Sequence, residues 1–172
     1  MDLMKLIVDV PDFPRPGVMF KDITRLLAHP AAYAEAIERM AAAIAPSRPA
    51  LIAGIEARGF IFGAAVAQRL GAGFVPLRKP GKLPGATHGI DYALEYGEDR
   101  IELRAGTLPA GARVAVVDDV LATGGTLAAA VGLLVAAGAV VEDAAVLLEL
   151  GFLDGRARLP GSLRLHALLH VD

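Results

Sequence analysis

The chain has 172 residues, a length that fits a single domain. Hydrophobic residues make up 55% and aromatic residues only 5%, so we expect a core built mostly from Ala, Val, Leu and Ile. The formal net charge of −2 argues against the broad basic surface that binds nucleic acid or anionic membranes. The absence of cysteine excludes disulfides and cysteine-based metal sites or nucleophiles.

Neither a signal peptide nor a membrane span is expected. The amino-terminal apolar run is short and is broken by Asp9 and Pro11. The longest apolar stretch, 127–141, contains two glycines and is shorter than the roughly 20 residues that a spanning helix needs. We therefore expect a soluble, cytoplasmic protein without membrane or nucleic-acid partners.

The elements alternate between strand and helix after a proline-rich amino-terminal segment. Residues 1–29 predict an ordered loop, with a short helix possible before its prolines. Helices are predicted at 30–45, 59–70 and 125–137, and strands at 50–55, 73–77, 113–117, 140–150 and, more weakly at an edge, 163–169. Residues 79–96 predict a loop, and 94–103 predict a hairpin around Gly97. The alternation predicts an α/β domain with a mainly parallel sheet flanked by helices on both faces, whose sites lie at the carboxyl ends of the strands.

The stretch VVDDVLATGGT at 116–126 carries the strongest chemical signal. Asp118 and Asp119 are expected at the end of a strand, and the turn 122–126 opens a helix. Its glycines let the backbone approach a ligand, and its N–H groups, helix terminus and threonine hydroxyls suit a terminal phosphate. The two carboxylates can accept hydrogen bonds from vicinal hydroxyls, so a sugar phosphate would satisfy both halves. No Lys follows the glycines, so the P-loop pattern is absent, as is G-x-G-x-x-G. The alternative is an ordinary helix start after a strand with surface aspartates.

Two further segments suit anions. Arg58 follows a predicted strand and opens a helix, where it could bind a phosphate with two hydrogen bonds; the alternative is a surface arginine. Arg78, Lys79 and Lys82 form a basic cluster with few acids near it in the sequence, which suggests a polyphosphate, with a solvated basic loop as the alternative.

The chain resembles a known enzyme family over nearly its whole length. Residues 114–126 are similar to the motif that binds phosphoribosyl pyrophosphate (PRPP) in type I phosphoribosyltransferases. FPRPGVMFKDIT at 13–24, GIEARGFIFG at 54–63, LRKPGKLPG at 77–85 and LEYG at 94–97 occur in this order in adenine phosphoribosyltransferases.

The resemblance implies the fold and the site residues. It implies one domain over 1–172 with the type I phosphoribosyltransferase fold, an amino-terminal hood at about 1–29 and a mobile catalytic loop at about 80–96. The ribose and its phosphate would bind Asp118, Asp119, Ala122, Thr123, Gly124, Gly125 and Thr126. Pyrophosphate would bind Glu56, Ala57, Arg58, Arg78, Lys79 and Lys82, with a cis peptide often present in the first turn and Lys82 in the mobile loop. Adenine would bind Met19, Phe20, Lys21 and Leu150.

Several of these positions have alternatives or depart from relatives. Phe20 taken alone reads as a core residue, whereas the resemblance makes it stack on the purine. Lys21 stands where many relatives carry Arg, which keeps the charge but not the bidentate geometry. Glu56 and Ala57 stand where some relatives carry Asp-Ser. Glu95, followed by Tyr96 in the loop, would transfer a proton at the purine, but the surrounding stretch is acidic and a solvated carboxylate is the alternative.

By this resemblance the chain transfers the 5-phosphoribosyl group from PRPP to adenine, giving AMP and pyrophosphate. Mg²⁺ is the implied cofactor, bound mainly through PRPP with no certain protein ligand, and a homodimer is expected. The alternatives are a phosphoribosyltransferase for another nucleobase and a PRPP-sensing regulatory protein. The hood sequence disfavours the first, and the net charge of −2 without a spare segment disfavours the second. The four histidines show no metal-ligand spacing.

Overall fold

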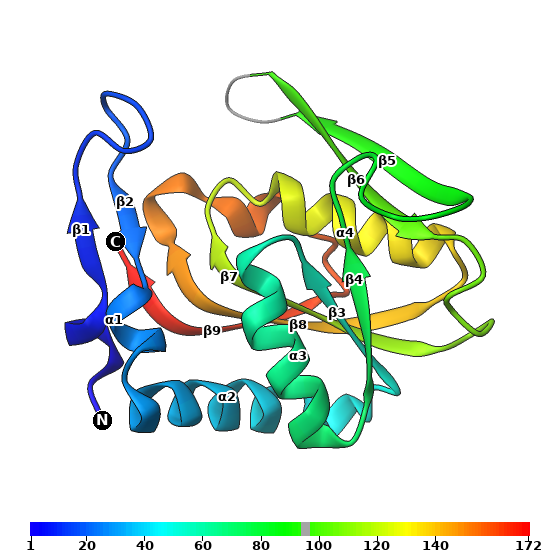
Figure 1. Ribbon diagram of the computed structural model, residues 1–172, viewed down its shortest axis with the longest axis horizontal. Helices are drawn as coiled ribbons and strands as arrows, with labels where there is room; N and C mark the ends of the chain where they lie inside the picture. Colours follow the sequence, from blue (N-terminus) through cyan, green and yellow to red (C-terminus); the bar gives the residue numbers. More distant parts are fainter. Residues whose placement is uncertain (94–96) are drawn as a thin grey trace.

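A parallel sheet lies at the centre of the computed structural model, which describes residues 1–93 and 97–172 (Figure 1). Its strand order is β4-β3-β7-β8-β9, and every neighbouring pair is parallel. The strands are β3 (Leu51–Ile55), β4 (Gly73–Leu77), β7 (Arg113–Leu121), β8 (Val140–Leu150) and β9 (Arg164–Val171). The parallel sheet and the edge position of the last strand are confirmed.

Helices cover both faces of the sheet, as the sequence predicts. Helices α2 (Pro30–Ile44) and α3 (Arg58–Leu70) lie on one face, and α4 (Gly125–Ala136) lies on the other (Figure 1). Each face buries its own core: Met40, Phe62 and Leu147 belong to the first, and Val116 and Leu134 to the second. Because side chains alternate across a strand, the apolar runs of β7 and β8 supply both cores.

An antiparallel hairpin covers the outer side of α4. Strand β5 (Thr87–Ala93) pairs with β6 (Glu98–Arg104), and Ile101 and Leu103 are buried in the α4 core. The predicted loop over 79–96 is therefore wrong for 87–93. Of the hairpin predicted at 94–103, residues 98–103 lie in β6, and 94–96 lie outside the described residues. Pairing with β6 stabilises β5. Gly89 of β5 lies so close to the guanidinium of Arg100 on β6 that a side chain there would overlap it. The hairpin also explains why α4 is apolar on all sides.

The amino-terminal segment is more regular than a loop. A 3₁₀ helix, η1 (Leu3–Leu6), precedes the antiparallel strands β1 (Val8–Val10) and β2 (Phe20–Asp22), and α1 (Thr24–Leu27) follows. The expected short helix is thus present, while the strand pair was not predicted. Leu3, Ile23 and Leu26 are buried in the α2 core, which fixes this hood to the sheet domain.

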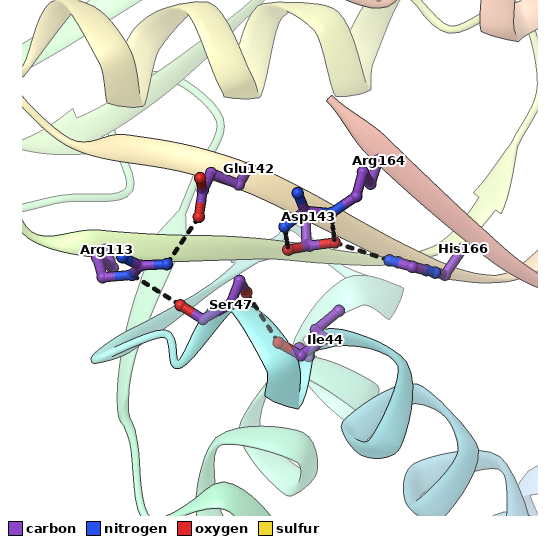
Figure 2. A network of polar contacts seen from close by, with 7 residues as sticks. All are labelled: Ile44, Ser47, Arg113, Glu142, Asp143, Arg164 and His166. Carbon is purple, nitrogen blue, oxygen red and sulfur yellow. Dashed lines mark hydrogen bonds and ion pairs between the residues drawn. The ribbon is translucent and has the colours of Figure 1, made fainter. Parts of the chain in front are cut away.

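The amino-terminal half of β8 carries a polar network around a buried carboxylate, Asp143 (Figure 2). Asp143, 2% exposed, accepts hydrogen bonds from Arg164 Nε and Nη2 at 3.0 and 2.6 Å, and His166 Nε2 lies 2.7 Å from its Oδ1. Three further 3₁₀ turns complete the described chain: η2 (Ala45–Ser47), η3 (Gly151–Leu153) and η4 (Gly155–Arg158). None of the helices within 1–93 and 97–172 has the length and apolar character to cross a membrane.

Candidate active site

Two adjoining cavities open at the carboxyl edge of the sheet. The first, of about 370 Å³, is lined by the ends of β3 and β7 and by the turn before α4, and we call it the polar cavity. The second, of about 600 Å³, is lined by hood residues and by the chain after β8, and we call it the hood cavity. Both are lined by Arg58, Val120, Ala122 and Thr123. One molecule could therefore extend from one cavity into the other.

The strand geometry explains why the polar cavity lies beside β7. The pairing of β3 with β7 ends at Gly54 and Val117, whereas β8 continues to pair with β7 as far as Leu121. Asp118 and Asp119 thus lie within the strand rather than after its end at 117, which corrects the predicted boundary. Pairing with the longer β8 holds them in extended backbone, while their side toward β3 is left open.

The aspartate pair has little positive charge to match it, although Asp119 is buried and Asp118 is half-buried. Asp119 is 4% exposed, and its Oδ2 lies 2.7 Å from Arg58 Nε. This contact is an ion pair without the angle of a hydrogen bond, so Oδ2 accepts no hydrogen bond from the described residues. Burial raises the pKa of Asp119, although Arg58 opposes the shift. Burial, and then the adjacent charge of Asp119, raise the pKa of Asp118 well above its usual range. A ligand that donates hydrogen bonds here would relieve this cost.

The turn from Ala122 to Thr126 has the geometry of an anion site. Ala122, Thr123, Gly124 and Thr126 line the polar cavity, and α4 begins at Gly125. Gly124 has φ of +82°, and no side chain of the described residues caps the N–H groups of the first turn. These N–H groups and the helix dipole remain available to a phosphate.

The turn after β3 brings Arg58 between the two cavities. The Glu56–Ala57 peptide is cis, as the resemblance implies, and α3 begins at Arg58. A Cβ at Gly59 would lie 2.8 Å from Asp118 Oδ1, so a glycine is needed where α3 meets β7. The Arg58 guanidinium lies 4.9 Å from the centre of the Phe20 ring and also pairs with Asp119.

The basic cluster is divided by the fold, and acids distant in sequence pair with it. Arg78 donates to both oxygens of Glu56 at 3.2 and 3.1 Å, and neither Arg78 nor Lys82 is among the residues that line the polar cavity. The hydrogen bond from Arg78 lowers the pKa of Glu56. The expectation of few nearby acids is therefore wrong in three dimensions. Glu56 after β3 and Asp99 in β6 lie beside the cluster, although both are distant from it in the sequence.

Lys79 is the member of the cluster that lines the polar cavity. Its Nζ pairs with Asp99 and donates to the Tyr92 hydroxyl at 3.1 Å. Burial acts against its charged form, but the bonds to Asp99 and Tyr92 outweigh that effect and raise the pKa of Lys79. Sequence reasoning missed Tyr92 and Asp99 as cavity residues. Recognition of the β5–β6 alternation would have placed both opposite the strand ends.

The four residues predicted to contact the base all line the hood cavity: Met19, Phe20, Lys21 and Leu150. Phe20 packs edge-on against Phe13, with ring centres 5.1 Å apart. Lys21 Nζ is held 2.7 Å from Asp9. The sequence reasoning missed Arg15, Phe152 and Leu153, which also line this cavity. Glu95 and Tyr96 lie outside the described residues.

Comparison with known proteins decides the family. The model of the phosphoribosyl transferase domain matches residues 22–158. The chain belongs to the adenine phosphoribosyltransferases of this family. It is 56% identical to the adenine phosphoribosyltransferase of Thermobifida fusca, over 97% of this chain and 94% of that one.

Solved structures of the family share the fold. The enzyme from Thermoanaerobacter pseudethanolicus matches with a TM-score of 0.95 and 46% identity, over 99% of this chain and 98% of that one. The Giardia lamblia enzyme, solved with 9-deazaadenine, matches with a TM-score of 0.94 and 39% identity, over 99% and 97% of the two chains. The chain is accordingly a pentosyltransferase with the type I phosphoribosyltransferase fold, and the reaction of the family joins adenine and PRPP to give AMP and pyrophosphate.

Proposed function

We propose that the polar cavity binds PRPP and the hood cavity binds adenine, so that sugar C1 and the purine nitrogen meet beside Arg58. The observation that carries this proposal is the shared wall of Arg58, Val120, Ala122 and Thr123. It lies between a cavity with the adjacent carboxylates of Asp118 and Asp119 and a cavity with an aromatic side chain. Holding two reactants in contact supplies much of the rate enhancement of such a transfer.

In this arrangement the 5-phosphate lies on the turn 122–126, with Gly125 at the start of α4. The ribose hydroxyls donate to Asp118 and Asp119. These hydrogen bonds favour the charged carboxylates, whose pKa values burial raises. The ionised pair then stabilises the positive charge that develops at C1 as the bond to pyrophosphate breaks.

Pyrophosphate lies between the turn 56–58 and Lys79. The peptide groups of Glu56 and Ala57 and the guanidinium of Arg58 face the polar cavity, and Lys79 supplies a second charge once it exchanges Asp99 for the ligand. Arg78 positions Glu56 through its hydrogen bonds to that carboxylate, and Lys82 binds pyrophosphate from the loop that follows.

Mg²⁺ fits this site because it prefers oxygen ligands and keeps only one or two carboxylates beside phosphate oxygens. The described residues contain no cluster of three or more metal-binding side chains, so oxygens of PRPP would hold the ion, with Asp118 and Asp119 among the carboxylates that line the cavity. When bound, it neutralises charge on the leaving pyrophosphate.

Adenine stacks between Phe20 and Leu150, while the backbone of Met19 reads the edge of the ring and Lys21 supports the hood through Asp9. Glu95, followed by Tyr96, takes or relays the purine proton when residues 80–96 close over the ligands. A Glu95→Gln variant should lower turnover more than it weakens PRPP binding. Normal turnover in that variant would remove Glu95 from the mechanism. We also propose a homodimer located in the cytoplasm.

Incubation with PRPP, Mg²⁺ and each nucleobase tests the proposed function. AMP and pyrophosphate should form with adenine far faster than the corresponding nucleotides form with hypoxanthine or guanine, because a site that pairs a polar ring edge rejects the wrong donor pattern. Comparable efficiency with hypoxanthine would overturn the assignment of the base.

A further inference from the structure

We propose that Arg158 is an additional cation of the 5-phosphate site, placed there by the turn that follows β8. The inference rests on the proposed function, which puts the phosphate of PRPP and AMP on residues 122–126. That turn consists of Ala, Thr and Gly, so it offers N–H and hydroxyl donors but no charge of its own. Asp118 and Asp119 lie just before it, so a positive side chain at this end would offset their repulsion of the phosphate.

The turn after β8 is the outer wall of the phosphate turn. A Cβ at Gly124 would overlap the carbonyl oxygen of Gly155, and a Cβ at Gly155 would overlap the carbonyl oxygen of Ala122. The two backbones therefore touch, and glycine is needed on both sides of the contact. The same stretch supplies Phe152 to the hood cavity, so it runs from the proposed base site to the proposed phosphate site.

Arg156 fixes this wall to the sheet. Its Nε and Nη2 each donate to the buried carboxylate of Glu149 at 2.7 Å, and its Nη1 donates to the carbonyl oxygen of Leu165 at 3.2 Å. The pair with Arg156 also lowers the pKa of Glu149. Arg156 is thus committed to β8 and β9 and serves to position the residues beside it.

Arg158 is placed two residues further along, at the start of α4. Its Nη1 lies 3.6 Å from the position that a Cβ at Gly125 would occupy. The side chain is exposed, and within 1–93 and 97–172 it has no ion pair or side-chain hydrogen bond. In contrast, Arg58 pairs with Asp119 and Arg78 with Glu56. Arg158 is therefore a cation available to a dianion on the first turn of α4.

The test compares ligands with and without the phosphate in the Arg158→Gln protein. Calorimetric titration should show AMP binding about ten-fold more weakly, as expected for loss of one charge-assisted hydrogen bond, while adenosine and pyrophosphate bind as before. Arg158→Lys should restore most of the AMP affinity. Arg48→Gln, an exposed arginine near the amino ends of the strands, is the control for the change of net charge.

Unchanged AMP affinity in Arg158→Gln would overturn the inference, and so would an equal loss for AMP and adenosine, which would indicate a merely structural role. A Thr126→Val variant separates this failure from failure of the proposed function. If it loses AMP affinity while Arg158→Gln does not, the phosphate turn stands without Arg158. If the unmodified protein fails to bind AMP, the proposed function itself is wrong.

Discussion

Two groups of carboxylates on the neighbouring strands β7 and β8 have different surroundings. In the first half of β8, Asp143 accepts two hydrogen bonds from Arg164 and contacts His166, and these contacts outweigh burial and hold the pKa of Asp143 at about 2 (Figure 2). In the last part of β7, Arg58 pairs with Asp119 but not with Asp118, and burial raises both pKa values. Asp143 thus has its partners within the fold, whereas the partners that we propose for Asp118 and Asp119 are the hydroxyls of the substrate.

The largest effect on turnover is expected at Asp118 and Asp119. Asp118→Asn with Asp119→Asn should lower turnover about 10²–10³-fold, by analogy with the loss of other preorganised groups that stabilise charge in a transition state. The free energy of unfolding should stay unchanged or rise, because the repulsion between two buried charges is removed. Initial rates of AMP formation and urea unfolding measure the two quantities. Near-normal turnover would show that Asp118 and Asp119 do not stabilise the transition state.

The opposite result is expected at the matched carboxylate. Asp143→Asn should lower the free energy of unfolding by about 2–4 kcal/mol, because Arg164 and His166 lose the charge that they surround. Turnover of the folded protein should be unchanged. Urea unfolding followed by circular dichroism, with the double variant as the matched control, tests this. A stable Asp143→Asn protein with reduced turnover would contradict the division of roles.

Lowering the pH should change the contributions of the two regions to stability in opposite directions. The folded pKa of Asp143 is lowered, so its contribution to stability is present above the unfolded pKa near 3.8 and is lost as pH falls toward about 2. The folded pKa values of Asp118 and Asp119 are raised, so their contribution is present below 3.8 and is lost as pH rises through the folded values. Protonation keeps the shape of the carboxyl group, so the loss at Asp143 should be smaller than that caused by substitution.

Unfolding curves between pH 2 and 7 would show this difference. Relative to the unmodified protein, Asp143→Asn should lose less stability on acidification. The double variant should gain a relative advantage as pH rises from 4 to 7. Parallel curves for all three proteins would mean that neither region controls the pH dependence.

The smallest effect is expected at the edge of the matched network. Ser47 is 7% exposed, its hydroxyl donates to the carbonyl oxygen of Ile44 at 2.8 Å, and its own carbonyl accepts from Arg113 Nε (Figure 2). Ser47→Ala should cost about 1 kcal/mol, the usual value for one hydrogen bond, without a change in turnover. Thermal unfolding is sensitive enough to detect it, and a loss as large as that of Asp143→Asn would show that the network acts as one unit.

Sequence patterns predicted the region of Asp118 and Asp119 better than the region of Asp143. The spacing of Asp118, Asp119 and the following glycines indicates a phosphate and hydroxyl site because those residue types are adjacent in the chain. The partners of Asp143 come from β9, more than twenty residues away, and their meeting depends on strand register. For the same reason the sequence did not predict that Glu56 pairs with Arg78, or that Asp99 pairs with Lys79.

Secondary structure was predicted best where it depends on local pattern. The parallel strands and helices were found within a few residues, because buried strands are continuously apolar and because glycine follows α3 and α4. The strands β1, β2 and β5 were missed. Gly89 lies within β5, prolines lie between β1 and β2, and all three strands are held extended by antiparallel partners. The contact between Gly124 and Gly155 likewise exists only in three dimensions.

The direct test of the central claim is a titration of the aspartate side-chain carbons by NMR, in the free protein and with ribose 5-phosphate. In the free protein, Asp143 should titrate at about 2 and the pair Asp118 and Asp119 above the usual range. Ribose 5-phosphate should lower the pKa values of the pair, because its hydroxyls favour the charged carboxylates, and should leave Asp143 unchanged. Ordinary pKa values for the pair in the free protein, or a pair that does not respond to the sugar, would contradict the account.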